Sequence, residues 1–340
     1  MIGSLIGLFS QDLALDLGSA RTRIHMRGAG VVVDVPTVVA TRTHRSGRRE
    51  LIALGDDAAA LIGRTPSGVQ AIRPVRAGRL AEPDLAVALV QHYVQSLHGR
   101  SNWIRPRMLI GMPHGAPDAV VRSLGDLCTA VGAREVTHLP QPIAAALGSG
   151  LSMDASAAHL LIDIGAGTTG IAVVCLNEVI ASTVLDIGGD VFDGAIVRLL
   201  KREHAVLVGQ PTAERMKLEL GAVGTPRSRR AHAAGRCLRR GIPRSVELDG
   251  EAIAAVLREP AAAIGAGIRR VLELTPREIA ADVVDHGALL CGGGSLLPGL
   301  DAALRADTGL AMLPGDAPDR AVARGLGLVM DGSATLRRVA

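Results

Sequence analysis

Residues His159–Thr169 read HLLIDIGAGTT, an apolar strand that runs into an Asp-x-Gly turn and is followed by a second apolar strand over Ile171–Val174. The same design occurs much earlier in the chain. There Leu15–Thr22 reads LDLGSART and leads into a β-rich stretch with a turn at Gly28–Gly30. Two strand–turn–strand units of this kind predict two similar α/β halves.

The two Asp-x-Gly turns carry residue types suited to phosphate and metal binding. Each places a carboxylate, Asp16 or Asp163, near the end of a strand, where ligands bind in α/β sheets. The small residues that follow let backbone N–H groups approach an anion closely, and Thr168 and Thr169 add hydroxyl groups. Two such turns facing each other would hold phosphates opposite a hydrated Mg²⁺. One Asp-x-Gly is a common turn, whereas two in matching contexts indicate a binding site.

The remaining periodic segments predict further helices and strands. Apolar residues at helical spacing predict helices over residues 84–97, 117–131, 142–147, 190–204, 212–221 and 251–274, and apolar runs predict strands over 107–112 and 289–291. We expect Thr212 to cap the start of its helix and Pro260 to break or bend the longest one. Alternating strands and helices predict the α/β class.

Composition excludes several classes of protein. The 340 residues are 48% hydrophobic and 21% charged, which excludes a disordered or fibrous chain. No charge-free apolar run is long enough to span a membrane. The four cysteines form no CxxC pair, which favours a reducing cytosol over a zinc site. The net charge is +4 and only 1% of residues are aromatic, so the chain lacks the stacking platform of a single-strand binder, and no nucleic acid is expected as a partner.

Three further features leave alternatives open. Residues 225–244 contain many arginines and no acid, which is typical either of an exposed loop with edge strands or of a surface for an acidic partner, lipid or protein. Glu214 and Lys217 share a helix face and form either a surface ion pair or part of a site, the latter suggested by the scarcity of lysine in this chain. The glycines of Gly292–Ser295 follow a strand and could leave room for a flat ligand.

Several segments, in this order, resemble the actin, Hsp70 and sugar-kinase superfamily, and within it the bacterial actin MreB and its paralogues. The segments are Asp16-Leu-Gly-Ser, Gln141-Pro-Ile-Ala-Ala-Ala-Leu-Gly, Asp163-Ile-Gly-Ala-Gly-Thr-Thr, Thr212-Ala-Glu-Arg-Met-Lys and Cys291-Gly-Gly-Gly-Ser-Leu-Leu-Pro-Gly-Leu. The resemblance runs from about residue 10 to about residue 330 without a large gap.

The resemblance implies an actin-like ATPase fold, with two RNase-H-like domains around a nucleotide cleft and a smaller subdomain in each. Domain I would comprise residues 1–148 with 318–340, and its subdomain would span about 34–70. Domain II would comprise residues 149–317, with a subdomain at about 186–250.

The resemblance also assigns roles to individual residues. The residues that would enclose the ATP phosphates are Asp16, Gly18, Ser19, Ala20, Arg21, Gly165, Ala166, Gly167, Thr168 and Thr169. Those that would hold the nucleoside are Glu214, Lys217, Gly292, Gly293, Gly294 and Ser295. Asp16 and Asp163 would face Mg²⁺ through its waters. Gln141 would orient the attacking water, with Thr168 beside it and Asp163 as the third residue of the catalytic set.

This chain departs from the MreB pattern at the turn and at the water-orienting position. Gln141 replaces the usual Glu, and an amide can position water but cannot act as a general base. Arg21 stands where an Asn is usual, and Gly170 replaces a common Glu. Because phosphoryl transfer depends mainly on positioning and charge stabilisation, slow ATP hydrolysis is still expected.

The function implied is that of an ATP-dependent, filament-forming cytoskeletal protein that organises cell-wall synthesis and cell or spore shape. Its partners would be further copies of itself, the inner membrane surface and proteins of the cell-wall elongation or morphogenesis complex, and it would lie in the cytoplasm at the inner face of the cell membrane. A nucleotide-binding scaffold without hydrolysis is the alternative. A small-molecule kinase is disfavoured because Gln141 offers no carboxylate to activate a substrate hydroxyl.

The N-terminal residues suggest how the chain would reach a membrane. Ile2, Leu5, Ile6 and Phe9 recur at helical spacing and would share one face of a short helix. Such a face either anchors at a membrane interface or packs against the protein. No Lys or Arg lies among the first ten residues, so a single copy should bind lipid weakly and a filament more strongly.

Overall fold

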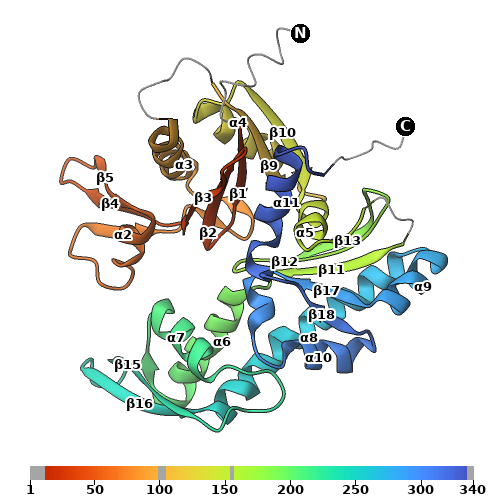
Figure 1. Ribbon diagram of the computed structural model, residues 1–340. Coiled ribbons are helices and arrows are strands. Elements are labelled where there is room, and N and C mark those ends of the chain that lie inside the picture. The colour runs from red at the N-terminus through yellow and green to blue at the C-terminus, as the bar shows by residue number, and fades with distance from the viewer. Residues whose placement is uncertain (1–11, 99–104, 154–156, 335–340) are drawn as a thin grey trace. The chain divides into compact units, whose positions relative to one another are not determined.

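The computed structural model describes residues 12–98, 105–153 and 157–334 (Figure 1). The N-terminal segment with Ile2, Leu5, Ile6 and Phe9 lies outside the described residues. The chain forms two compact units. As far as these segments are described, unit 1 comprises Met1–Ala157, Val174–Ser182 and Asp319–Ala340, and unit 2 comprises Ala158–Val173 and Thr183–Pro318.

Unit 1 is built on a five-stranded sheet with the order β10-β9-β1-β2-β3. Its strands are β1 (Leu13–Leu17), β2 (Arg21–Met26), β3 (Gly30–Pro36), β9 (Arg107–Met112) and β10 (Glu135–Pro140). β1, β2 and β3 form an antiparallel meander, whereas β1, β9 and β10 are parallel. Every residue of β1 is buried, which explains its nearly continuous apolar sequence.

Helices α3 (Pro83–His98), α4 (Asp118–Ala130), α5 (Gln141–Gly148) and α11 (Ala321–Met330) complete the core of unit 1. α5 and α11 lie side by side in Figure 1 and pack backbone to backbone. A Cβ atom at Gly148 would lie 1.8 Å from the Ala321 carbonyl oxygen, and one at Gly325 would lie 1.8 Å from that of Ala144. This close crossing therefore depends on glycine in both helices.

A smaller sheet with the order β5-β4-β6 also belongs to unit 1. It consists of β4 (Val39–Thr43), β5 (Arg49–Leu54) and β6 (Val69–Ile72), next to the short helix α2 (Gly55–Ala59). The two-stranded ribbon of β7 (Val75–Arg76) and β8 (Arg79–Leu80) follows in the chain.

The second five-stranded sheet repeats the first. Its order is β13-β12-β11-β17-β18, with β11 (His159–Ile164), β12 (Thr169–Cys175), β13 (Glu178–Leu185), β17 (Ala288–Cys291) and β18 (Met312–Pro314). In both sheets the strands run third, second, first, fourth, fifth in chain order, and the first, fourth and fifth are parallel. The two similar halves predicted from the duplicated turn are therefore confirmed.

The remaining elements of unit 2 are helices and one small sheet. The helices are α6 (Gly189–His204), α7 (Gln210–Leu220), α8 (Gly250–Leu274), α9 (Arg277–His286) and α10 (Leu300–Thr308), with the short 3₁₀ helix η1 (Gly293–Leu296). A second 3₁₀ helix, η2 (Pro318–Arg320), leads into α11. The sheet has the order β14-β15-β16, from β14 (Val206–Leu207), β15 (Arg230–Cys237) and β16 (Pro243–Asp249). No helix in the described part of the chain is long and apolar enough to cross a membrane.

One local prediction is wrong, and a second is wrong in that the expected break in a helix does not occur. Helix α7 begins at Gln210 and its N-cap is Gly209, so Thr212 lies inside the first turn, where Pro211 fits because it needs no N–H partner. Helix α8 continues through Pro260 without a break. Its face with Ile253, Leu257 and Ile264 is fully buried, and this packing outweighs the cost of about 3 kcal/mol for an internal proline.

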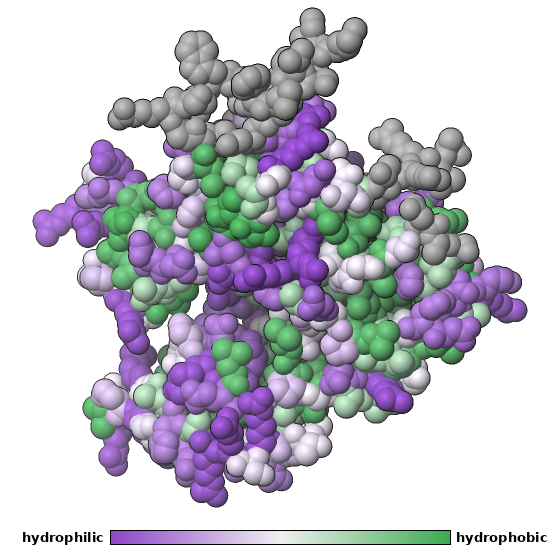
Figure 2. Space-filling model, in the orientation of Figure 1, coloured by the Kyte–Doolittle hydropathy of each residue, from purple (hydrophilic) through white to green (hydrophobic). Residues whose placement is uncertain are grey.

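The arginine-rich stretch forms the antiparallel hairpin of β15 and β16 with the residues around it. All of its arginines are exposed except Arg227, which is half-buried. In Figure 2 the part of the face that carries this hairpin is predominantly hydrophilic.

Candidate functional site

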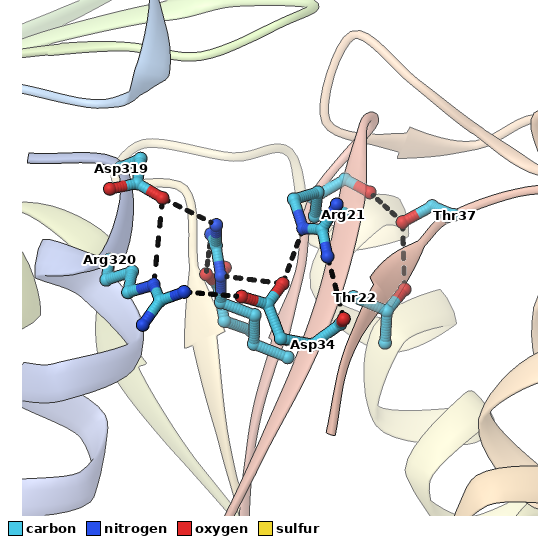
Figure 3. Close-up of polar contacts among 9 residues, drawn as sticks. Arg21, Thr22, Asp34, Thr37, Asp319 and Arg320 are labelled. Carbon is cyan, nitrogen blue, oxygen red and sulfur yellow. Dashed lines mark hydrogen bonds and ion pairs between the residues drawn. The ribbon is translucent and has the colours of Figure 1, made fainter. Parts of the chain in front are cut away.

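The first Asp-x-Gly turn (residues 16–22, hereafter the first turn) connects β1 to β2 in unit 1. Gly18 donates its N–H to the Arg21 carbonyl at 3.0 Å, and a Cβ at Gly18 would lie 2.9 Å from that oxygen. The Thr37 hydroxyl donates to the Gly18 carbonyl at 2.8 Å and lies 2.8 Å from the Thr22 hydroxyl, as Figure 3 shows. The turn is thus held by its own backbone and by two buried threonines.

The second Asp-x-Gly turn (residues 163–169, the second turn) connects β11 to β12 and repeats the backbone hydrogen bond of the first turn at the same spacing. Gly165 donates its N–H to the Thr168 carbonyl at 2.8 Å. The hydroxyl of Thr169, which corresponds to Thr22, donates to the Ile187 carbonyl at 2.7 Å. The repetition predicted from the sequence therefore extends to the backbone hydrogen bond of the turn and to a buried Thr at its end, although the two Thr hydroxyls have different partners.

A pair of glycines at the start of α6 supports the second turn from behind. Gly189 donates its N–H to the Gly165 carbonyl at 3.0 Å, and Asp190 donates to that of Ala166 at 2.8 Å. A Cβ at Gly188 would lie 2.5 Å from the Ala166 carbonyl oxygen. Only glycine at position 188 lets α6 approach the turn this closely.

The glycine cluster Gly292–Ser295 follows β17, which pairs in parallel with β11 so that Asp163 lies opposite Cys291. Gly292 has a φ of +77°, and a Cβ there would lie 2.5 Å from the Asp163 carboxylate oxygen Oδ1. A Cβ at Gly294 would lie 2.4 Å from the Ile164 side chain. Gly292 and Gly294 are thus required by the end of β11, whether or not a ligand binds, while Gly293 is exposed.

Lys217 lies beside the second turn and forms an ion pair that the sequence did not reveal. Its ammonium is 2.8 Å from a carboxylate oxygen of Asp193 on α6, and it donates to the Gly189 carbonyl at 3.2 Å. Asp193 is buried, and burial raises its pKa to about 6 even though Lys217 opposes the shift. Glu214 is half-buried on α7, one turn before Lys217.

Asp16 in the first turn is buried and lies opposite Arg23 in the register of β1 and β2. The Arg23 Nη1 atom is 3.8 Å from a carboxylate oxygen of Asp16. Burial raises the pKa of the Asp16 carboxyl to about 6, against the opposing charge of Arg23. A buried Asp with a raised pKa at the end of a strand is the kind of perturbed group found at functional sites.

Arg21 does not extend freely from the first turn. Its Nε and Nη2 atoms donate to Asp34 on β3, at 2.5 Å to the carboxylate and 2.7 Å to the carbonyl oxygen. Figure 3 shows Asp34 between Arg21 and Arg320. Although burial opposes it, these contacts and the Arg23 charge lower the pKa of Asp34.

Gln141 begins α5 directly after β10 and is half-buried. Because β1, β9 and β10 are parallel, their carboxyl ends meet at one edge of the unit 1 sheet. Gln141 and the first turn therefore lie at the same edge. Asp163, Gly165–Thr169 and Gly292–Ser295 likewise gather at one edge of the second sheet, near Lys217 through Gly189.

The carboxylates at these edges suit a metal ion only if it keeps its waters. Among residues 12–98, 105–153 and 157–334, no group of three His, Cys, Asp or Glu side chains is placed to hold a metal. Mg²⁺ bound with phosphates retains several waters and needs few protein carboxylates. Asp16 and Asp163 fit that role, although Asp16 already has a guanidinium against it.

Arg23, Asp34 and Asp193 are polar residues of these edges that sequence reasoning missed. A signal for the first was present: Arg21, Arg23 and His25 alternate along β2 and so share one face, yet Arg23 and His25 are buried. Buried charges on a strand indicate partners on the neighbouring strands.

Comparison with known proteins gives a consistent result. A family model described as "MreB/Mbl protein" matches residues 10–338. The chain is 38% identical over 335 residues to the cell shape-determining protein MreB of Escherichia coli K12, covering 97% of this chain and 96% of that protein. It is 33% identical over 325 residues to the cell shape-determining protein Mbl of Bacillus subtilis 168, covering 95% and 97%.

Solved structures agree with these sequence matches. The AMPPNP-bound MreB5 of Spiroplasma citri has a TM-score of 0.87 at 28% identity, covering 93% of this chain and 94% of that one. A MamK double helical filament has a TM-score of 0.75 at 21% identity, covering 94% and 98%, and shows a likeness of fold. The predicted actin-like fold is confirmed.

Proposed function

The chain belongs to the MreB/Mbl family, as its motifs predicted, and from this premise we propose that it is an ATP-binding protein that polymerises into cytoskeletal filaments and determines cell shape. The relatives named as cell shape-determining proteins match it over nearly their whole length. The filaments would consist of further copies of this chain, and their task would be to organise cell-wall synthesis together with proteins of the elongation or morphogenesis complex.

The observation that carries nucleotide binding is the duplicated turn. Each turn has a Gly whose N–H bonds the carbonyl three residues on, a buried Thr that fixes the backbone, and an Asp close to the strand end. Small residues at these positions leave backbone N–H groups accessible to an anion. The MreB5 structures that match the chain are bound to AMPPNP and to ADP. We assign the ATP phosphates to both turns, and the nucleoside to Glu214, Lys217 and Gly292–Ser295.

Slow hydrolysis of ATP to ADP and phosphate is the proposed reaction. Gln141 would orient water through its amide, and Asp16 and Asp163 would face the waters of Mg²⁺, which neutralises phosphate charge when bound. Thr168, within the second turn, would contribute its hydroxyl. The alternative is a scaffold that binds nucleotide without significant turnover, and a small-molecule kinase is disfavoured because Gln141 supplies no base.

Phosphate release measured together with ATP-dependent sedimentation separates these alternatives. We expect wild type to pellet with ATP and Mg²⁺ and to release phosphate slowly. Gln141→Ala should reduce the release rate with nearly unchanged nucleotide affinity, because a water-orienting amide acts mainly in the transition state. Gln70→Ala, on the exposed side of β6, is the matched control. Pelleting without phosphate release above buffer supports the scaffold, and no ATP-dependent pelleting contradicts the filament proposal.

The membrane face is the proposed location, with Ile2, Leu5, Ile6 and Phe9 as the anchor. We expect the full chain to bind vesicles of phosphatidylethanolamine and phosphatidylglycerol only when ATP allows polymerisation, because many weak anchors then act together. Deletion of residues 1–10 should reduce this binding. Equal binding by the deleted and full-length chains, at matched polymer mass, would place the anchor elsewhere.

A further inference from the structure

A row of opposite charges crosses the sheet of unit 1 next to the first turn. The strand registers pair Asp16 on β1 with Arg23 on β2, and Arg23 with Asp34 on β3. The Arg23 side chain is 8% exposed. It is therefore a buried guanidinium held between two carboxylates, where solvent screens its charge poorly.

The position of Arg23 is fixed by its other contacts. Its Nη2 atom donates to Asp319 at 3.1 Å and its Nε atom is 3.2 Å from Asp34. Asp34 in turn accepts a hydrogen bond from Arg21, and its carboxylate lies 3.5 Å from the Arg320 guanidinium. Figure 3 shows these groups together. The Nη1 atom of Arg23 lies 3.8 Å from a carboxylate oxygen of Asp16 and supplies positive charge to it, whereas the charge of Asp34 acts on Asp16 in the opposite direction.

The second turn has no such arrangement on its strand. Counting from the Asp, the residue that corresponds to Arg23 is Gly170, and a Cβ placed there would meet nothing within 4 Å. At this strand position the first turn therefore has a buried guanidinium where the second turn has a glycine.

We infer that Arg23 is a positioning residue that acts as a built-in counter-charge to Asp16 and so lowers the dependence of nucleotide binding on Mg²⁺; the inference rests on the proposed function. An uncompensated Asp16 repels phosphates until a divalent cation neutralises both. With Arg23 in place the carboxylate is already compensated, and a further cation also experiences repulsion from the guanidinium. Asp16 therefore contributes less to the affinity for Mg²⁺.

The test is calorimetric titration with ADP, once in Mg²⁺ and once in EDTA. We define the Mg²⁺ gain as the Kd in EDTA divided by the Kd in Mg²⁺. Arg23→Met removes the charge at similar length, and its Mg²⁺ gain should exceed that of wild type by about tenfold, mostly through weaker binding in EDTA. Arg23→Lys keeps a cation and should stay within about twofold of wild type. Arg23→Gln keeps polar contacts without charge and serves if Arg23→Met unfolds.

A cycle with Asp16 separates this role from a structural one. In Arg23→Met combined with Asp16→Asn, Asp16 no longer carries a charge for Mg²⁺ to neutralise, and the Mg²⁺ gain should fall well below that of Arg23→Met alone. The inference would be overturned if folded Arg23→Met has the same Mg²⁺ gain as wild type, including the case in which its ADP binding is weakened by the same factor with and without Mg²⁺. If wild type binds no ADP even with Mg²⁺, the proposed function itself fails, and this inference with it.

Discussion

The first and second turns have the same backbone and different charges. Gly18 and Gly165 make the same hydrogen bond three residues along the chain, and a buried Thr anchors each turn to a later segment. Yet the first turn contains Arg21 and is followed by Arg23, while the second has Thr168 and Gly170 at the corresponding positions. The backbone geometry determines which groups a turn could contact, whereas the neighbouring side chains determine the electrostatic charge around it.

The supports behind the turns also differ. Thr37 donates its N–H to the Ala20 carbonyl behind the first turn, while Gly188 and Gly189 at the start of a helix stand behind the second. The support of the first turn therefore tolerates a side chain, that of Thr37, whereas the support of the second turn excludes one at Gly188. The second turn is therefore the more sensitive to a change in its support.

Gly188→Ala should have the largest effect on stability. Its Cβ would lie 2.5 Å from the Ala166 carbonyl oxygen, so the helix or the turn must move. We expect a loss of about 3 kcal/mol in the free energy of unfolding, measured by denaturant titration. Gly170→Ala is the control, since a Cβ there meets no atom within 4 Å, and it should change stability by less than about 0.5 kcal/mol. Equal effects would show that α6 does not constrain the turn.

Asp163→Asn should weaken ADP binding in Mg²⁺ by about a hundredfold, the size expected for losing charge-assisted contacts. Asp16→Asn should weaken it by less than about tenfold, because Arg23 already compensates Asp16. Asp126→Asn, on the exposed side of α4, is the matched control. Equal losses at positions 16 and 163 would mean that the two turns do not differ in charge as described.

The pH dependence of stability should report the buried carboxyls near the two turns. The pKa of Asp16 and of Asp193 is raised from 3.8 to about 6, so between these values the folded chain binds more protons than the unfolded chain. Each group therefore makes the free energy of unfolding fall as pH rises from about 4 to 6, by about 2 kcal/mol.

Asp16→Asn and Asp193→Asn should each remove part of this decrease, measured as denaturant midpoints across that range. A decrease that is identical in wild type and in both variants would assign the titration to other groups. A decrease altered in only one variant would confine the effect to the corresponding turn.

Thr37 and Thr169, which anchor the first and the second turn, should differ in their contribution to stability because their hydroxyls make different numbers of hydrogen bonds. The Thr37 hydroxyl contacts both Thr22 and Gly18, while that of Thr169 bonds Ile187. Thr37→Val should cost about 2 kcal/mol and Thr169→Val about 1 kcal/mol, since each leaves buried polar groups unpaired. The reverse order in thermal or denaturant unfolding would contradict this difference between the anchors.

The sequence was sufficient to predict the repeated fold because the motif that specifies it is local. A strand, an Asp-x-Gly turn and a second strand can be recognised within about a dozen residues, and two copies imply two similar sheets. The partners of Arg23 could not be predicted in the same way. They depend on the registers of β1, β2 and β3 and on η2, far along the chain.

Two further differences between prediction and structure have equally specific causes. Thr212 is a favoured capping residue, but Pro211 already fits the helix, and Gly209 becomes the cap. Gly292 and Gly294 suggested space for a ligand, whereas the end of β11 takes up the space where their side chains would be. A glycine motif indicates close approach without saying whether a ligand or the protein's own backbone makes it.

The central claim is that the two turns bind nucleotide phosphates, and calorimetric titration of wild type with ADP and with adenosine, both in Mg²⁺, tests it most directly. We expect one ADP per chain and binding of adenosine at least about a hundredfold weaker, because the backbone N–H groups and the Mg²⁺ of the proposed site would act on the phosphates alone. Equal affinity for ADP and adenosine, or no binding of either, would contradict the account.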